Sequence, residues 1–111
     1  MRIKPSVIYQ WAKTYQTTQG YIIRVKMKLQ RLSKINKKEF PQDYKFNWIA
    51  YNVENANQRV LFDNHHGKSP HFHIDKDKQG IPFTWLSREK SETLFWEQIN
   101  QRFGSLRNYT L

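Results

Sequence analysis

The chain has 111 residues, of which 38% are hydrophobic and 15% aromatic, enough to build one domain over residues 1–111 and too many for a disordered chain. It contains no cysteine, which excludes a disulfide scaffold, a thiolate nucleophile and cysteine-ligated zinc. There is no run of about 18 apolar residues and no apolar stretch behind the N-terminal charges. We therefore expect a cytoplasmic protein without a membrane span or a signal peptide.

The formal net charge of +10 lies entirely in the first third of the chain. Residues 1–38 contain ten basic residues and no acidic one, whereas residues 39–111 contain nine of each. A polyanion such as nucleic acid is the expected partner of so basic a segment. The alternatives are an acidic protein partner, a membrane surface or a role in solubility, and the first of these can coexist with nucleic acid.

A β-hairpin is predicted near the start of the chain. Residues 7–16 alternate in strand fashion, and residues 21–30 alternate more regularly, with apolar side chains on one side and cations on the other. The intervening Thr17-Thr18-Gln19-Gly20 is typical of a turn, in which Gly20 can take a positive φ. We expect one face of the hairpin on a core and the basic face in water.

Further strands are predicted in the middle of the chain. Residues 44–53 alternate as a third strand, and the Asn-rich residues 52–57 indicate a turn into a short fourth strand over 59–62. Residues 63–70 have the composition of a loop, and residues 71–74 are expected to form a short strand or sheet edge.

The last predicted element is an amphipathic helix. Ser87 is the expected N-cap and Gly104 the expected stop. Four apolar residues share one face at helical spacing: Leu94, Phe95, Ile99 and Phe103. The order of elements predicts an α+β fold, with an antiparallel sheet of about four to five strands and the C-terminal helix packed on one of its faces.

All four histidines fall within nine residues, at positions 65, 66, 71 and 73. Histidine is the side chain best suited to moving protons near neutral pH. On an extended segment His71 and His73 point the same way, while Phe72 points into the core. Asp63 can orient an imidazole or act as a base, and Lys68 and Arg59 can hold a phosphate.

Cleavage of RNA needs a base for the 2′-hydroxyl, an acid for the leaving 5′-oxygen and a cation for the charge that develops on phosphorus, and it needs no metal or other cofactor. The candidate catalytic residues are His71, His73, Lys68, Asp63 and His66. The candidate nucleic-acid-binding residues are Arg24, Lys26, Lys28, Arg31, Lys34, Lys37, Lys38 and Arg59.

Two other interpretations of the histidines stay open at this point. They can form a zinc or manganese site with Asp63, although the spacing matches no standard zinc signature. They can also stabilise a loop or stack on RNA without chemistry, which makes the protein a nucleic-acid- or ribosome-binding module. For Asp63 and Asn64 a turn-capping role is the alternative to a functional one.

The block from Arg59 to His73 resembles the TumE family of toxins from bacterial and archaeal toxin–antitoxin modules. The family pattern is an aromatic residue, Asp-Asn, two variable residues, Gly-Lys, two variable residues and His-x-His, represented here by Phe62, Asp63, Asn64, Gly67, Lys68, His71 and His73. The neighbouring order is also similar, with a first hairpin turning at Gly20 and a Pro82-Phe83 pair before the C-terminal helix. The resemblance implies a small ribonuclease toxin whose partners are RNA and a helix-turn-helix antitoxin.

Overall fold

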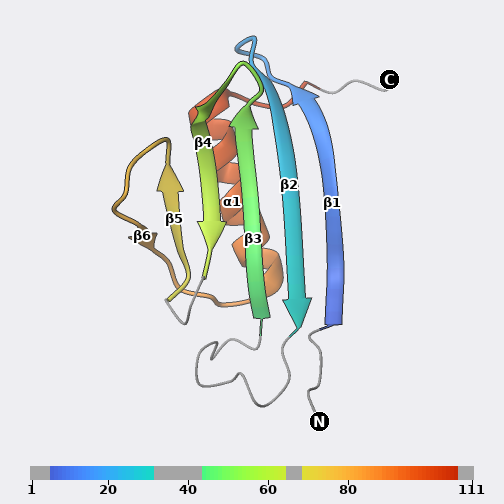
Figure 1. Cartoon of the computed structure of the whole chain (residues 1–111), viewed down its shortest axis with the longest axis vertical. Coiled ribbons are helices and arrows are strands. Elements are labelled where there is room, and N and C mark those ends of the chain that lie inside the picture. Colours follow the sequence, from blue (N-terminus) through green and yellow to red (C-terminus); the bar gives the residue numbers. More distant parts are fainter. Residues whose placement is uncertain (1–5, 32–43, 65–68, 108–111) are drawn as a thin grey trace.

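The computed structural model describes residues 6–31, 44–64 and 69–107, which form a six-stranded antiparallel sheet with one helix across one face (Figure 1). The strands follow each other in chain order across the sheet. Their bounds are β1 Ser6–Gln16, β2 Ile22–Arg31, β3 Tyr44–Asn52, β4 Asn55–Asp63, β5 His71–Ile74 and β6 Ile81–Pro82, followed by α1 Arg88–Phe103. The predicted α+β fold is confirmed, and the two-residue β6 adds one strand at the edge.

The first hairpin forms as its alternation predicts. β1 and β2 pair from Ser6 opposite Arg31 to Gln16 opposite Ile22, with an irregularity of the register between Val7 and Tyr9. Gly20 takes a φ of 90° in the turn, and its N–H donates to the carbonyl of Thr17 at 3.0 Å. A left-handed φ of this size favours glycine over residues with a Cβ.

The second hairpin is tighter than its composition predicts. The expected turn is present but shorter than residues 52–57, because β3 ends at Asn52 and β4 already begins at Asn55. Asn52 caps this turn: its side-chain oxygen accepts from Glu54 N–H at 3.0 Å, and its amide donates to Gln58 Oε1 at 2.8 Å. Since one such side chain is enough to cap a tight turn, the later asparagines are left to extend the strand.

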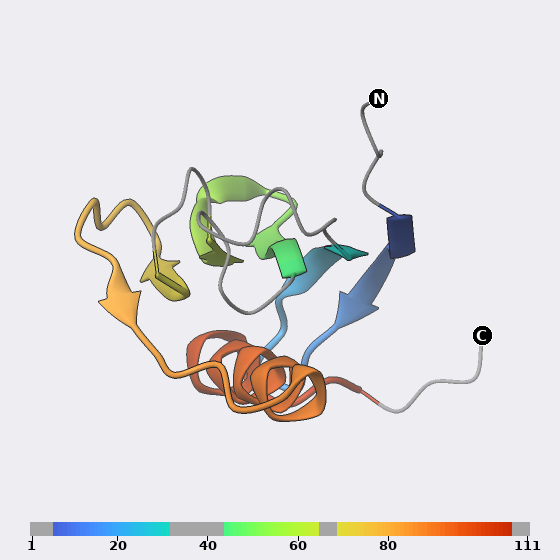
Figure 2. The ribbon, with the colours of Figure 1, turned by 90° about the horizontal axis from the view of Figure 1, so that it is seen from below.

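The core lies between the sheet and α1, and none of the described elements covers the other face (Figure 2). Phe95 of α1 packs 5.8 Å from the ring of Trp48 and 5.3 Å from that of Phe62, measured between ring centroids. Fully burying one such aromatic side chain contributes about 1.5–3 kcal/mol. Together with Ile99 and Phe103, which are also fully buried, Phe95 fixes which face of the sheet the helix covers.

The ends of α1 are those that the sequence predicts. Ser87 Oγ accepts from the backbone N–H of Lys90 at 3.1 Å. Gly104 ends the helix with a φ of 92°, and its N–H donates to the carbonyl of Asn100 at 2.9 Å. In the described part of the chain no helix is long and apolar enough to cross a membrane.

Candidate nucleic-acid interface and histidine pair

The side chains that point away from α1 form a surface that we call the open face. Strand register arranges them in rows, and one row runs through Gln10, Lys28, Asn47, Asp63 and His71, one residue from each of β1 to β5. Adjacent strands lie about 4.8 Å apart, so Lys28 and His71 are separated by about 14 Å across β3 and β4. The basic strand and the histidines therefore occupy the same surface.

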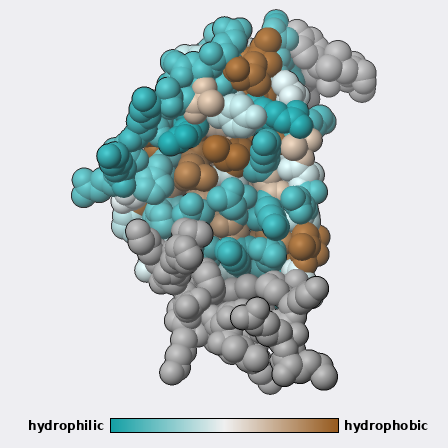
Figure 3. Space-filling model, in the orientation of Figure 1, coloured by the Kyte–Doolittle hydropathy of each residue, from teal (hydrophilic) through white to brown (hydrophobic). Residues whose placement is uncertain are grey.

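A second row lies beside the first and runs through Lys26, Ile49, Leu61 and His73. The centre of the open face is accordingly apolar, and hydrophilic side chains surround it (Figure 3). Lys26 Nζ lies 5.9 Å from the centroid of the Tyr51 ring, which belongs to the next row along β3. The face thus combines cations, an aromatic ring and two aliphatic side chains.

The charge on the open face is strongly positive. Among the described strand residues that point to this side, Asp63 is the one acidic residue, and the cations are Arg24, Lys26, Lys28, Lys45 and Arg59. The helix, by contrast, carries three basic and three acidic residues. A polyanion is consequently attracted to the open face rather than to the helix.

His71 has an oxygen atom near each ring nitrogen. Its Nδ1 lies 2.7 Å from the carbonyl oxygen of Ser69, which can only accept, so Nδ1 is assigned the proton. Its Nε2 lies 3.0 Å from Asp63 Oδ1. That contact is short but not aligned as a hydrogen bond, since the buried Asp63 Oδ1 has no bonded donor among the described residues. The two groups can form an ion pair when the imidazole is protonated.

His73 is held differently. Its Nδ1 lies 3.0 Å from the carbonyl oxygen of Asp77, which assigns the proton to Nδ1 and leaves the lone pair on Nε2. Within the described ranges no hydrogen-bond partner contacts Nε2. The two imidazoles are 5.0 Å apart between centroids with their planes at 87°. His73 is therefore placed to accept a proton, and His71 can supply one when its ring is protonated.

Gly80 lets the chain pass against both imidazoles. A Cβ at this position would lie 2.8 Å from His71 Cδ2 and 3.3 Å from His73 Cε1, closer than real side-chain contacts allow in the first case. Residues 75–80 are polar and turn-like in the sequence, which by itself gives them no link to the histidines. The contacts of Gly80, Ser69 and Asp77 with the histidines are missed by sequence reasoning, because they arise from backbone atoms that carry no residue-specific signal.

Asn64 has a structural role at the end of β4. Its side chain is fully buried, donates to the carbonyl of Tyr44 at 2.7 Å and accepts from the N–H of Phe46 at 3.1 Å. These two bonds continue the attachment of the chain to β3 beyond the last ladder pair. The geometry favours the capping interpretation of Asn64 and fixes where the histidine-rich loop begins.

The other predicted residues divide into three groups. Arg59 lies on the open face, where its Nε donates to the carbonyl of Asp75 at 3.3 Å. Arg31 ends β2, and strand alternation places it on the side opposite Lys28. The remaining residues fall outside the described part of the chain: Lys34, Lys37, Lys38, His65, His66, Gly67 and Lys68.

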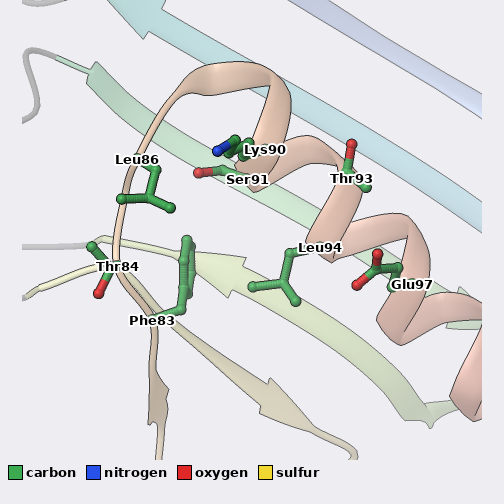
Figure 4. Close-up of a pocket in the computed structure, with 8 residues that line it drawn as sticks. All are labelled: Phe83, Thr84, Leu86, Lys90, Ser91, Thr93, Leu94 and Glu97. Atoms are coloured by element: carbon green, nitrogen blue, oxygen red, sulfur yellow. The ribbon is translucent and has the colours of Figure 1, made fainter.

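Two of the hollows on the surface of the described residues bear on where the site lies. A hollow of about 480 Å³ on the open face is lined by Gln10, Trp11, Ala12, Lys26, Met27, Lys28 and Asn47. The other, of about 350 Å³, lies between α1 and the segment before it, where Figure 4 shows Phe83 and Leu94 facing each other. The second hollow contains none of the predicted site residues, so the candidate site is on the open face.

These observations define a basic, open-faced α+β sheet protein with an oriented histidine pair near one edge of the sheet. No family model, no curated protein and no solved structure matches the chain.

Proposed function

We propose that the chain is a metal-independent endoribonuclease whose open face binds RNA and whose histidine pair cleaves it. The observation that carries the proposal is the strand register, which aligns His71 and His73 with Lys28 and Lys26 on one surface. A cationic surface that leads to two oriented imidazoles supplies both the affinity and the proton transfer that RNA cleavage requires.

In the proposed reaction His73 Nε2 accepts the proton of a ribose 2′-hydroxyl. The 2′-oxygen attacks the adjacent phosphorus, the bond from phosphorus to the 5′-oxygen breaks, and His71, acting as the doubly protonated imidazolium, passes its Nε2 proton to that oxygen. The products are a 2′,3′-cyclic phosphate and a 5′-hydroxyl. Each proton transfer contributes roughly 10²–10⁴-fold to the rate. Asp63 positions the His71 ring, and Lys68 stays the predicted source of charge stabilisation.

We further propose that this ribonuclease is the toxin of a toxin–antitoxin module in the cytoplasm and that a helix-turn-helix antitoxin neutralises it. The resemblance of residues 59–73 to the TumE pattern supports this part of the proposal. The basic open face adds to it, because inhibition of growth through RNA requires a surface that binds RNA.

The second candidate is a nucleic-acid-binding protein without catalysis. It is favoured by one observation: both ring nitrogens of His71 approach oxygens of the protein itself, as they do in a purely structural histidine. Under this alternative the open face binds RNA and the histidines only order the loop before β5.

Purified protein incubated with end-labelled total RNA, with and without EDTA, separates these possibilities. We expect cleavage that resists EDTA and is lost in the His71→Ala/His73→Ala variant, while RNA binding survives in that variant. Cleavage that EDTA abolishes would assign the histidines to a metal site. Salt-sensitive binding without cleavage by the wild type would establish the non-catalytic alternative.

A further inference from the structure

We propose that the hollow over β1, β2 and β3 is a subsite for a nucleotide of the same RNA strand that is cleaved at the histidine pair, and that this strand is single-stranded. The inference rests on the proposed function. It adds that the RNA substrate is single-stranded and that a second site, away from the reacting phosphate, binds it.

The lining of the hollow matches a nucleotide. Lys26 and Lys28 supply two cations, one for each of two phosphates of the strand, and the hollow has a volume of about 480 Å³. Gln10 and Asn47 add two side-chain amides, each of which can both donate and accept hydrogen bonds. Such amides pair well with the edges of bases, which phosphate-binding cations do not recognise. The hollow thus offers both kinds of contact in one place.

The hollow is connected to the histidines by the rows of the open face. Lys28 and Asn47 share a row with His71, and Lys26 shares a row with His73. The distance from β2 to β5 is about 14 Å, and a stacked strand advances 3.4 Å per nucleotide, so at most about four nucleotides separate the two points. Between them the row contains Ile49 and Leu61, which provide an apolar surface on which bases can rest.

The shape of this face favours a single strand over a duplex. The described residues of the open face are strand residues, and in those ranges no helix or hairpin projects from it to enter a groove. The Watson–Crick edges of bases are open to a flat surface only in unpaired nucleotides. Gln10 and Asn47 can therefore contact these edges only when the strand is not base-paired.

The test compares Lys26→Gln/Lys28→Gln with a matched variant, Lys13→Gln/Lys90→Gln, which removes the same charge from the helix side of β1 and from α1. The substrates are a dinucleotide and a single-stranded oligonucleotide of about ten nucleotides, long enough to reach the hollow. We expect the first variant to lower kcat/KM about tenfold on the oligonucleotide and to leave the dinucleotide unchanged. Its slope of log affinity against log salt should fall by about 1.4, for two lost phosphate contacts. The matched variant should resemble the wild type.

Equal losses on both substrates, or the same loss in the matched variant, would overturn the subsite. Binding of a non-cleavable 2′-O-methyl oligonucleotide keeps this result separate from the proposed function. If no RNA is cleaved but only the Lys26→Gln/Lys28→Gln variant loses affinity for this oligonucleotide, the proposed ribonuclease activity is wrong and the proposed subsite is supported. If the wild type binds a duplex of the same sequence as tightly as the single strand, the inference about single strands is wrong.

Discussion

The two histidines differ in what their ring nitrogens face, and this difference assigns their roles. Among the described residues His73 Nε2 has no hydrogen-bond partner, whereas His71 Nε2 lies against Asp63. The sequence could predict that both side chains point the same way, because residues two apart on a strand share a face. It could not predict which nitrogen each ring exposes, since the carbonyls of Ser69 and Asp77 set that orientation.

Gly80→Ala tests the geometry of the pair. The added methyl group would lie 2.8 Å from His71 Cδ2, so the ring must move. We expect kcat to fall by roughly tenfold to a hundredfold, because small misplacements of reacting groups are costly. RNA binding should be retained, as the open-face cations are untouched. Steady-state cleavage and filter binding measure the two effects.

Gly20→Ala is the matched control for that substitution. Gly20 has a φ of 90° and no heavy atom within 4 Å of an added Cβ, so the change strains the backbone but leaves the site alone. It should lower the free energy of unfolding by about 1 kcal/mol or more and leave kcat unchanged. Equal kcat values for Gly80→Ala and the wild type would contradict the role given to Gly80.

At the scale of elements, β1 is joined to α1 by a hydrogen bond from Tyr9 to Glu92. The hydroxyl donates to Glu92 Oε2 at 2.6 Å, and the Trp11 and Trp96 rings stack beside it with centroids 6.3 Å apart. Burial, together with the bond and charge of Glu92, raises the pKa of Tyr9 well above its usual range. The sequence predicted both elements, but it could not show that this pair connects them, because the two residues are far apart in the chain.

The raised pKa of Tyr9 predicts a loss of stability in alkali. The folded state favours the neutral phenol, so its contribution is complete below the unfolded pKa of about 10 and is lost as the pH rises above it. Tyr9→Phe should lower the free energy of unfolding by about 1 kcal/mol at neutral pH and make its decrease above pH 10 smaller than in the wild type. Urea unfolding of both proteins at neutral pH and above pH 10 provides the test. The same alkaline decrease in the free energy of unfolding for the variant and the wild type would contradict the prediction.

At the scale of the whole molecule, the sequence predicted the order of the elements and the covered face of the sheet. Alternation in residues 21–30 and 44–53 and the helical spacing of Phe95, Ile99 and Phe103 were sufficient for this. The sequence could not predict the rows of side chains across the sheet. They depend on the register between strands, which sequence alternation leaves undetermined by any even number of residues.

That register is what places cations and histidines in the same rows of the open face. A shift of two residues between β4 and β5 would keep every buried side chain facing the core but move His71 away from Asp63. The relation between the basic strand and the histidines therefore came from the structure and not from the pattern of residues.

The chemistry of the cleaved ends tests the histidine mechanism most directly. A defined single-stranded RNA would be cleaved by the wild-type protein in EDTA and its fragments weighed by mass spectrometry. We predict a 2′,3′-cyclic phosphate on one fragment and a 5′-hydroxyl on the other, with no cleavage when the scissile nucleotide lacks its 2′-hydroxyl. Fragments that carry a 5′-phosphate and a 3′-hydroxyl would contradict proton transfer from the 2′-hydroxyl to His73.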